Sequence, residues 1–151
     1  MQDFYNLQRF IDAQNQDYET IVQELESGQK RGHWMWFIFP QIKELGRSEV
    51  AQRFAISCNQ EAIAYLEHPI LGTRLKQCTQ LVMNTSGLDV EQIFPYPDDR
   101  KFHSSMTLFA ASSKTDNDLF MKALTKFFGG KQDGMTLDIL KSQDHDVIEE
   151  Q

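Results

Sequence analysis

The stretch Trp34-Met35-Trp36-Phe37-Ile38-Phe39, closed by Pro40, decides the fold class of this sequence. Six apolar residues in a row suit either a buried strand or a short buried helix, and periodicity does not separate the two. A strand needs a partner, yet the chain contains no second run of this kind, no alternating apolar pattern and no Asn-Gly hairpin signal. We therefore interpret the stretch as a buried helix or an irregular core segment within an all-α fold.

Helical periodicity continues on the N-terminal side of this stretch. Asp3 has the position of an N-cap for a first helix, whose buried face includes Phe4. Asn15 or Asp17 then starts a second helix, and Gly28 ends it. We expect two consecutive helices before the aromatic run.

Helical periodicity also continues on the C-terminal side of the aromatic run. Ser48 has the position of an N-cap, and two pairs, Ser57 with Gln60 and Asp89 with Gln92, have the spacing of a capping box. The longest apolar stripe on one helix face consists of Leu71, Leu75, Cys78 and Val82. These patterns predict several further helices after Gly46.

The helical segments together predict one compact all-α domain of about eight helices over residues 1–143. Residues 144–151 are predicted to form an acidic, disordered tail, because they hold four acids and no Lys or Arg. The tail accounts for four of the seven net negative charges, which leaves −3 on the domain.

The composition is typical of one soluble globular domain, with 151 residues, 40% apolar and 25% charged. The 15 Lys and Arg against 22 Asp and Glu give a formal charge of −7. Nucleic acids and anionic membranes attract clustered positive charge, so this balance argues against both as partners. Two isolated cysteines fit a reducing compartment. We expect a soluble, cytoplasmic protein.

The first candidate site is the basic turn directly before the aromatic run. Arg31 and His33 could contact an anion, while Trp34 and Trp36 could stack on a planar ring. Arg47, just before a predicted helix, adds a further cation for the same anion. The alternative is that the aromatic side chains form the core and the basic residues are a solvated turn.

The second candidate site lies at the start of the segment after Pro97. Asp99, Lys101 and Ser105 are candidate catalytic residues, with Asp99 as the acid or base, and Ser104 is a candidate ligand-binding residue. Hydroxyl side chains compete for backbone hydrogen bonds inside a helix, so their accumulation here indicates a site. The alternative is an ordinary helix start with an i,i+3 ion pair between Asp98 and Lys101.

These two segments favour a small-molecule pocket that binds or hydrolyses a phosphorylated, nucleotide-like ligand. The four histidines lack metal-ligand spacing and no cofactor motif occurs, so we expect neither a metal nor a cofactor. Whether the protein is an enzyme stays open. The alternative function is a helical protein-protein interaction module without catalytic activity, which predicts an exposed apolar patch for an unknown protein partner.

Five segments of the chain also carry a family resemblance: Leu7-Gln8-Arg9-Phe10, His33-Trp34-Met35-Trp36-Phe37-Ile38-Phe39-Pro40-Gln41, Leu45-Gly46-Arg47-Ser48, His68-Pro69-Ile70-Leu71-Gly72-Thr73-Arg74-Leu75 and Ser104-Ser105-Met106-Thr107-Leu108-Phe109. In this order they resemble the domain of unknown function 1810 family over residues 3–141. The resemblance implies a mainly α-helical fold and no catalytic residues, since the family's function is not established. Its occasional label, calpastatin-like, does not fit a chain without repeats or disordered composition.

Overall fold

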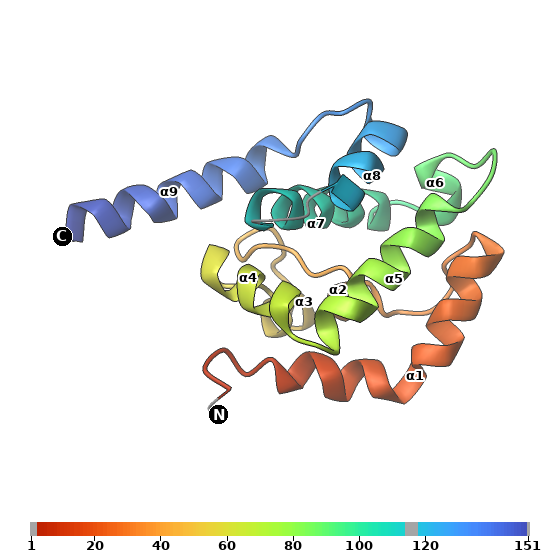
Figure 1. The fold of residues 1–151 in the computed structure, drawn as a ribbon, viewed down its shortest axis with the longest axis horizontal. Helices are drawn as coiled ribbons and strands as arrows, with labels where there is room; N and C mark the ends of the chain where they lie inside the picture. The colour runs from red at the N-terminus through yellow and green to blue at the C-terminus, as the bar shows by residue number, and fades with distance from the viewer. Residues whose placement is uncertain (1–2, 114–117, 151) are drawn as a thin grey trace.

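The computed structural model describes residues 3–113 and 118–150, and Figure 1 shows their arrangement. These residues form nine α-helices and no strand, with one isolated bridge between Ile42 and Ile56. The helices are α1 (Gln8–Ser27), α2 (Met35–Ile38), α3 (Glu49–Arg53), α4 (Asn59–Glu67), α5 (Leu71–Met83), α6 (Val90–Ile93), α7 (Asp98–Ser112), α8 (Asp118–Phe128) and α9 (Gly134–Glu150). The all-α prediction is confirmed, and the decisive aromatic run contains a short helix.

The N-terminal segment forms one kinked helix where the sequence predicts two. Asp17 has non-helical backbone angles, φ −138° and ψ 19°, so the predicted boundary is a kink inside α1. The carboxylate of Asp3 accepts the N–H groups of Leu7 and Gln8 at 2.7 and 2.8 Å, and these bonds outweigh burial to lower the pKa of Asp3. Phe4, in contrast, is 84% exposed, so its predicted place on a buried face is wrong.

The predicted caps of the middle helices are mostly confirmed. The hydroxyl of Ser48 accepts the N–H of Ala51 at the start of α3, and Asp89 with Gln92 forms the capping box of α6. The predicted box of Ser57 with Gln60 is wrong. Glu61, one residue later, accepts both the N–H and the hydroxyl of Ser57, because Cys58 rather than Ser57 is the residue before α4.

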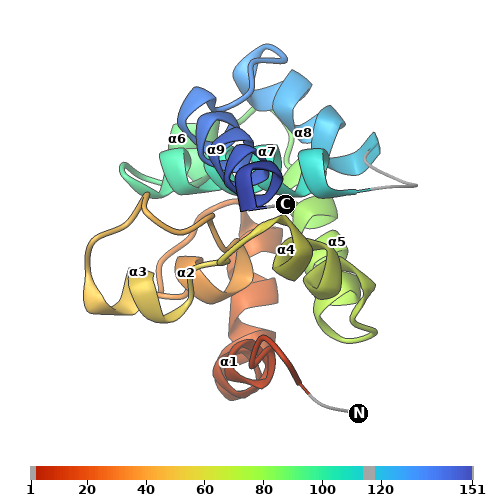
Figure 2. The same ribbon diagram turned by 90° about the vertical axis from the view of Figure 1, so that its left-hand side faces the viewer.

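Aromatic rings fill the core between two groups of helices. Figure 2 shows α1 on one side of the molecule and α7, α8 and α9 on the other. Helix α7 packs against α4, α8 and α9, while α5 contacts both α1 and α8. Between them, the rings of Phe39, Phe94 and Phe102 are in mutual contact, with centroids 4.9 to 5.8 Å apart. Cys78 is buried too, and burial raises the pKa of its thiol to about 11.

The helix α5 begins at a close crossing with α4. A Cβ on Gly72 would overlap the carbonyl oxygen of Leu66, so glycine lets the start of α5 approach the end of α4. The predicted stripe from Leu71 to Val82 is buried, as its period indicates.

The last helix, α9, extends away from the body in Figure 1. It runs to Glu150, so the predicted boundary between domain and tail falls inside its bounds, and residue 151 lies outside the described residues. The side-chain amide of Gln143 donates to the carbonyl of Ser57 at 2.8 Å. The division into a domain and a disordered tail stays a prediction. In the described part of the chain, no helix has both the length and the apolar character to cross a membrane.

Candidate functional site

The side chains of the aromatic run point to three different surroundings. Trp34 is only 3% exposed and packs on Phe94, so it belongs to the core. Trp36 is half-buried and lies under the ammonium of Lys101, 4.3 Å from the indole centroid. Phe37 is half-buried, and its ring centroid lies 5.5 Å from that of Phe54. Of the aromatic residues in this run, Phe37 lines a hollow beside α1.

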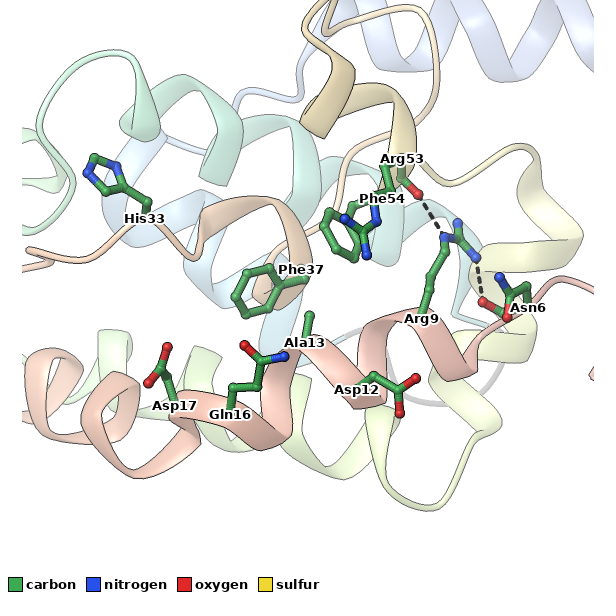
Figure 3. A pocket seen from close by; sticks show the side chains of 10 residues that line it. All are labelled: Asn6, Arg9, Asp12, Ala13, Gln16, Asp17, His33, Phe37, Arg53 and Phe54. Atoms are coloured by element: carbon green, nitrogen blue, oxygen red, sulfur yellow. Dashed lines mark hydrogen bonds between the residues drawn. The ribbon is translucent and has the colours of Figure 1, made fainter.

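That hollow is a groove of about 750 Å³ between α1, the α2 segment and the end of α3 (Figure 3). Polar side chains from α1 form one wall, and Phe37 with Phe54 forms the opposite one. The lining residues are Asn6, Arg9, Asp12, Ala13, Gln16, Asp17, His33, Phe37, Arg53 and Phe54. We refer to it below as the groove.

Two arginines line the groove in different states. Arg9 donates to the carbonyls of Arg53 and Ala55, each at 2.8 Å, and forms an ion pair with buried Glu61 at 2.9 Å. It holds the end of α3 against α1. The Arg53 guanidinium lies 5.2 Å from the ring of Phe54, and none of the ion pairs among the described residues involves it. Of the two groove arginines, Arg53 is thus the one without an ion pair among the described residues.

The backbone and indole N–H groups of the basic turn before the aromatic run bind a carboxylate of the chain itself. One carboxylate oxygen of Glu24 accepts the N–H groups of Arg31 and Gly32, at 2.6 and 2.9 Å, and the indole N–H of Trp34 at 3.0 Å. Burial alone would raise the pKa of Glu24, but these donors and nearby Lys30 lower it. The side chains of Arg31 and Arg47 are exposed, away from the groove lining.

The start of α7 carries a network of ion pairs. Asp98 binds the ammonium groups of Lys30 and Lys101 at 2.8 and 3.3 Å, so the i,i+3 pair considered for this segment is present. Asp99 is half-buried, and its Oδ1 is a buried atom without a hydrogen-bond partner among the described residues. Ser105 is fully buried and its hydroxyl is also without such a partner.

Two further hydroxyls of α7, those of Ser104 and Thr107, form hydrogen bonds with Asp133, the residue before α9. Ser104 donates to the carbonyl of Arg100 at 3.1 Å and to Asp133 Oδ2 at 3.3 Å. The hydroxyl of Thr107 accepts the N–H of Asp133 at 2.9 Å. Asp133 also accepts the N–H of Thr136 at 3.1 Å, in the first turn of α9. Of the hydroxyls that indicate a site in the sequence, that of Ser104 therefore links α7 to the residue before α9, whereas that of Ser105 has no hydrogen-bond partner among the described residues.

Few of the predicted site residues come together. His33 lines the groove, Trp36 lines a separate small hollow, and Lys101 and Ser105 line none of the cavities described. The groove residues that sequence reasoning missed, such as Arg53, come from three segments and form no local motif. The catalytic roles of Asp99, Lys101 and Ser105 stay predictions. Across the described residues, no three His, Cys, Asp or Glu side chains are grouped to hold a metal ion.

Comparison with known proteins identifies the family. The chain belongs to the DUF1810 family of proteins of unknown function, which matches residues 4–140. One solved structure that it resembles is the conserved hypothetical protein Rv1873 from Mycobacterium tuberculosis, with a TM-score of 0.90 and 48% sequence identity. That comparison covers 92% of this chain and 99% of the other. No curated protein matches the chain.

Proposed function

We propose that the groove binds a small phosphorylated, nucleotide-like molecule. The observation that carries this proposal is the guanidinium of Arg53, which borders an aromatic-walled groove and makes none of the ion pairs of the described residues. A guanidinium in this state presents a planar fork of donors that matches two phosphate oxygens. The volume of about 750 Å³ lies in the usual range of small-molecule sites.

The other groove residues suit the rest of such a molecule. The half-buried ring of Phe37 offers a face on which a base can stack. The carboxylates of Asp12 and Asp17 only accept hydrogen bonds, so they match the hydroxyl groups of a sugar. His33, exposed at the groove, is the predicted ligand-binding residue that this proposal retains.

A thermal-shift screen with nucleotides, ADP-ribose and sugar phosphates tests the proposal. A ligand at 100 times its Kd raises the free energy of unfolding by about 2.7 kcal/mol, which is readily visible. Arg53→Gln should weaken binding of the ligand at least about tenfold in isothermal titration calorimetry, since a charge-assisted hydrogen bond contributes about 1.5–3 kcal/mol. Phe37→Ala should weaken it at least about fivefold, since the stacking of a base on an aromatic ring contributes about 1–3 kcal/mol.

The matched control is Arg100→Gln. Arg100 is likewise exposed and stacked on an aromatic ring, with its guanidinium 4.9 Å from the ring of Tyr96, but it lies on α7 away from the groove lining. Its replacement should leave affinity unchanged. Full affinity in both groove variants, or no thermal shift with any compound of the screen, would refute the proposal.

A second candidate function, the helical interaction module, is favoured by a different surface. The exposed Phe4 lines an apolar hollow of about 500 Å³ with Leu7, Ala64 and Pro69. Because the protruding ring and the hollow share one surface, two copies of the chain could exchange Phe4 rings across a two-fold axis. Sedimentation velocity tests this candidate. Phe4→Ser should abolish a concentration-dependent dimer, and a wild-type chain that stays monomeric would exclude this exchange of Phe4 rings between two copies.

A further inference from the structure

A second hollow adjoins the groove at the kink of α1. It has a volume of about 440 Å³ and shares Gln16 and Asp17 with the groove. Its other lining residues are Asn15, Tyr18, Glu19, Thr20 and Arg74. The non-helical backbone of Asp17 interrupts α1 at this point, so both hollows lie beside the same kink and have Gln16 and Asp17 as shared lining residues.

Arg74 lines the second hollow and, unlike the exposed Arg53, is half-buried there. Its guanidinium stacks 4.6 Å from the ring of Tyr18 and donates to the side-chain oxygen of Gln14 at 3.3 Å. The ion pairs of the described residues do not include it. A guanidinium has five N–H donors, so most of those on Arg74 remain for a ligand.

The groups between the two arginines have the opposite character. Asp12, Gln16 and Asp17 supply carboxylate and amide oxygens along α1, and carboxylates repel a phosphate but accept from hydroxyl groups. The two adjoining hollows therefore hold one arginine each that makes none of the ion pairs of the described residues, Arg53 and Arg74, with acceptor groups in their shared lining and with Glu19 also beside Arg74. This arrangement suits a molecule with an anionic group at each end and a hydroxylated middle, whose second anionic group binds Arg74 and whose hydroxyl groups face the carboxylates.

We infer that the ligand of the groove carries a second anionic group, which binds to Arg74 in the adjoining hollow. This inference rests on the proposed function and narrows the ligand class to two-ended phosphorylated molecules such as nucleoside bisphosphates. Adenosine 3′,5′-bisphosphate and AMP are a matched pair of probes, because they differ only in the second phosphate.

Isothermal titration calorimetry of both probes against the wild-type chain, Arg53→Gln, Arg74→Gln and the control Arg100→Gln tests the inference. The bisphosphate should bind the wild-type chain at least about tenfold more tightly than AMP, the size expected for one charge-assisted contact. Arg74→Gln should remove this advantage and leave AMP binding unchanged. Arg53→Gln should weaken both probes.

The outcomes separate the inference from the proposed function. If AMP binding depends on Arg53 but the bisphosphate gains nothing, or keeps its gain in Arg74→Gln, the inference is overturned and the proposed function stands. If both probes bind the wild-type chain and Arg53→Gln equally well, the proposed function falls with the inference. Failure of both probes to bind at millimolar concentration overturns the inference, and the wider ligand screen then decides the proposed function.

Discussion

The basic turn at residues 30–34 and the groove beside α1 present similar donors in two different states. In the turn, Glu24 accepts the N–H groups of Arg31 and Gly32, and Asp98 binds the ammonium of Lys30. In the groove, the guanidinium of Arg53 rests on an aromatic ring and has no part in the ion pairs of the described residues. The backbone N–H groups of the turn and the ammonium of Lys30 are thus paired within the chain, whereas the guanidinium of Arg53 at the groove makes no ion pair among the described residues.

The difference teaches what makes a donor cluster an anion site. In the sequence, the turn is the stronger candidate. Its backbone N–H groups, the indole of Trp34 and the ammonium of Lys30 nevertheless bind carboxylates of the chain, as does the hydroxyl of Ser104. A buried donor must find a partner, and a helical chain with many acids supplies one wherever its packing permits. The guanidinium of Arg53 differs from these donors because it lines a hollow and makes none of the ion pairs of the described residues.

The largest expected loss of stability comes from replacing Arg9, the groove arginine that forms an ion pair. Arg9→Gln leaves the carboxylate of Glu61, only 3% exposed, without its cation. Loss of one partner of a buried pair costs about 3–5 kcal/mol, so we expect the free energy of unfolding to fall by about 3 kcal/mol in urea denaturation.

The double variant Arg9→Gln with Glu61→Gln checks the cause. It removes the stranded charge, and Glu61 keeps side-chain acceptors for Ser57 as a glutamine. Recovery of part of the lost stability in the double variant is the expected result. Equal stability of the single and double variants would mean that Arg9 acts through its carbonyl contacts alone.

The next effect concerns the carboxylate that completes the turn. Glu24→Gln keeps the shape but removes the charge that three donors share, and hydrogen bonds to charged groups exceed neutral ones, so we expect a loss of about 2 kcal/mol at pH 7. Because folding lowers the pKa of Glu24 below its ordinary value of 4.5, its contribution is present above that pH and is lost as the pH falls through the lower folded pKa.

Thermal unfolding between pH 7 and pH 3 measures this dependence. The gap in Tm between the wild-type chain and Glu24→Gln should be constant near neutral pH and should close in acid. Glu26→Gln, an exposed neighbour on the same helix, is the matched control and should show no such gap. A gap that persists unchanged to pH 3 would contradict the charge-based account.

The fold could be predicted much further from the sequence than the candidate site. Local signals report local structure: Ser48, Gly28 and the pair of Asp89 with Gln92 act at the helix ends where their spacing places them. The absence of a second strand-like run also led to the correct prediction that Trp34–Phe39 forms no strand. These predictions rest on interactions within one or two helical turns.

The site could not be predicted in the same way, because it depends on contacts between distant segments. Arg9 forms an ion pair with Glu61, which lies 52 positions away in the sequence. Nothing near Arg53 in the sequence shows that Arg53 lacks such a partner. The α7 hydroxyls illustrate the opposite error. Ser104 lies in a segment with the composition of a site, yet its partner is Asp133, 29 positions away.

A smaller loss of stability is expected from a change at Asp133, the carboxylate that accepts from Ser104. Asp133→Ala removes the side chain that accepts from Thr136 in the first turn of α9 and from Ser104 of α7. Loss of a cap of this kind costs typically about 1 kcal/mol, which urea denaturation resolves. Ser104→Ala, which removes one of the donors, should cost less. A larger loss for Ser104→Ala than for Asp133→Ala would place the main role of Ser104 elsewhere.

The smallest effect on stability, and the sharpest contrast with Arg9, is expected for Arg53→Gln. The guanidinium of Arg53 is exposed and contacts only the ring of Phe54 among the interactions described, so its removal should change the free energy of unfolding by no more than about 0.5 kcal/mol. Natural selection for folding alone would leave such an arginine replaceable, whereas a ligand site requires it. Urea denaturation of Arg53→Gln beside Arg9→Gln measures the contrast directly. A loss near that of Arg9→Gln would show that Arg53 holds the fold together, and the groove would then have no free cation to bind an anion.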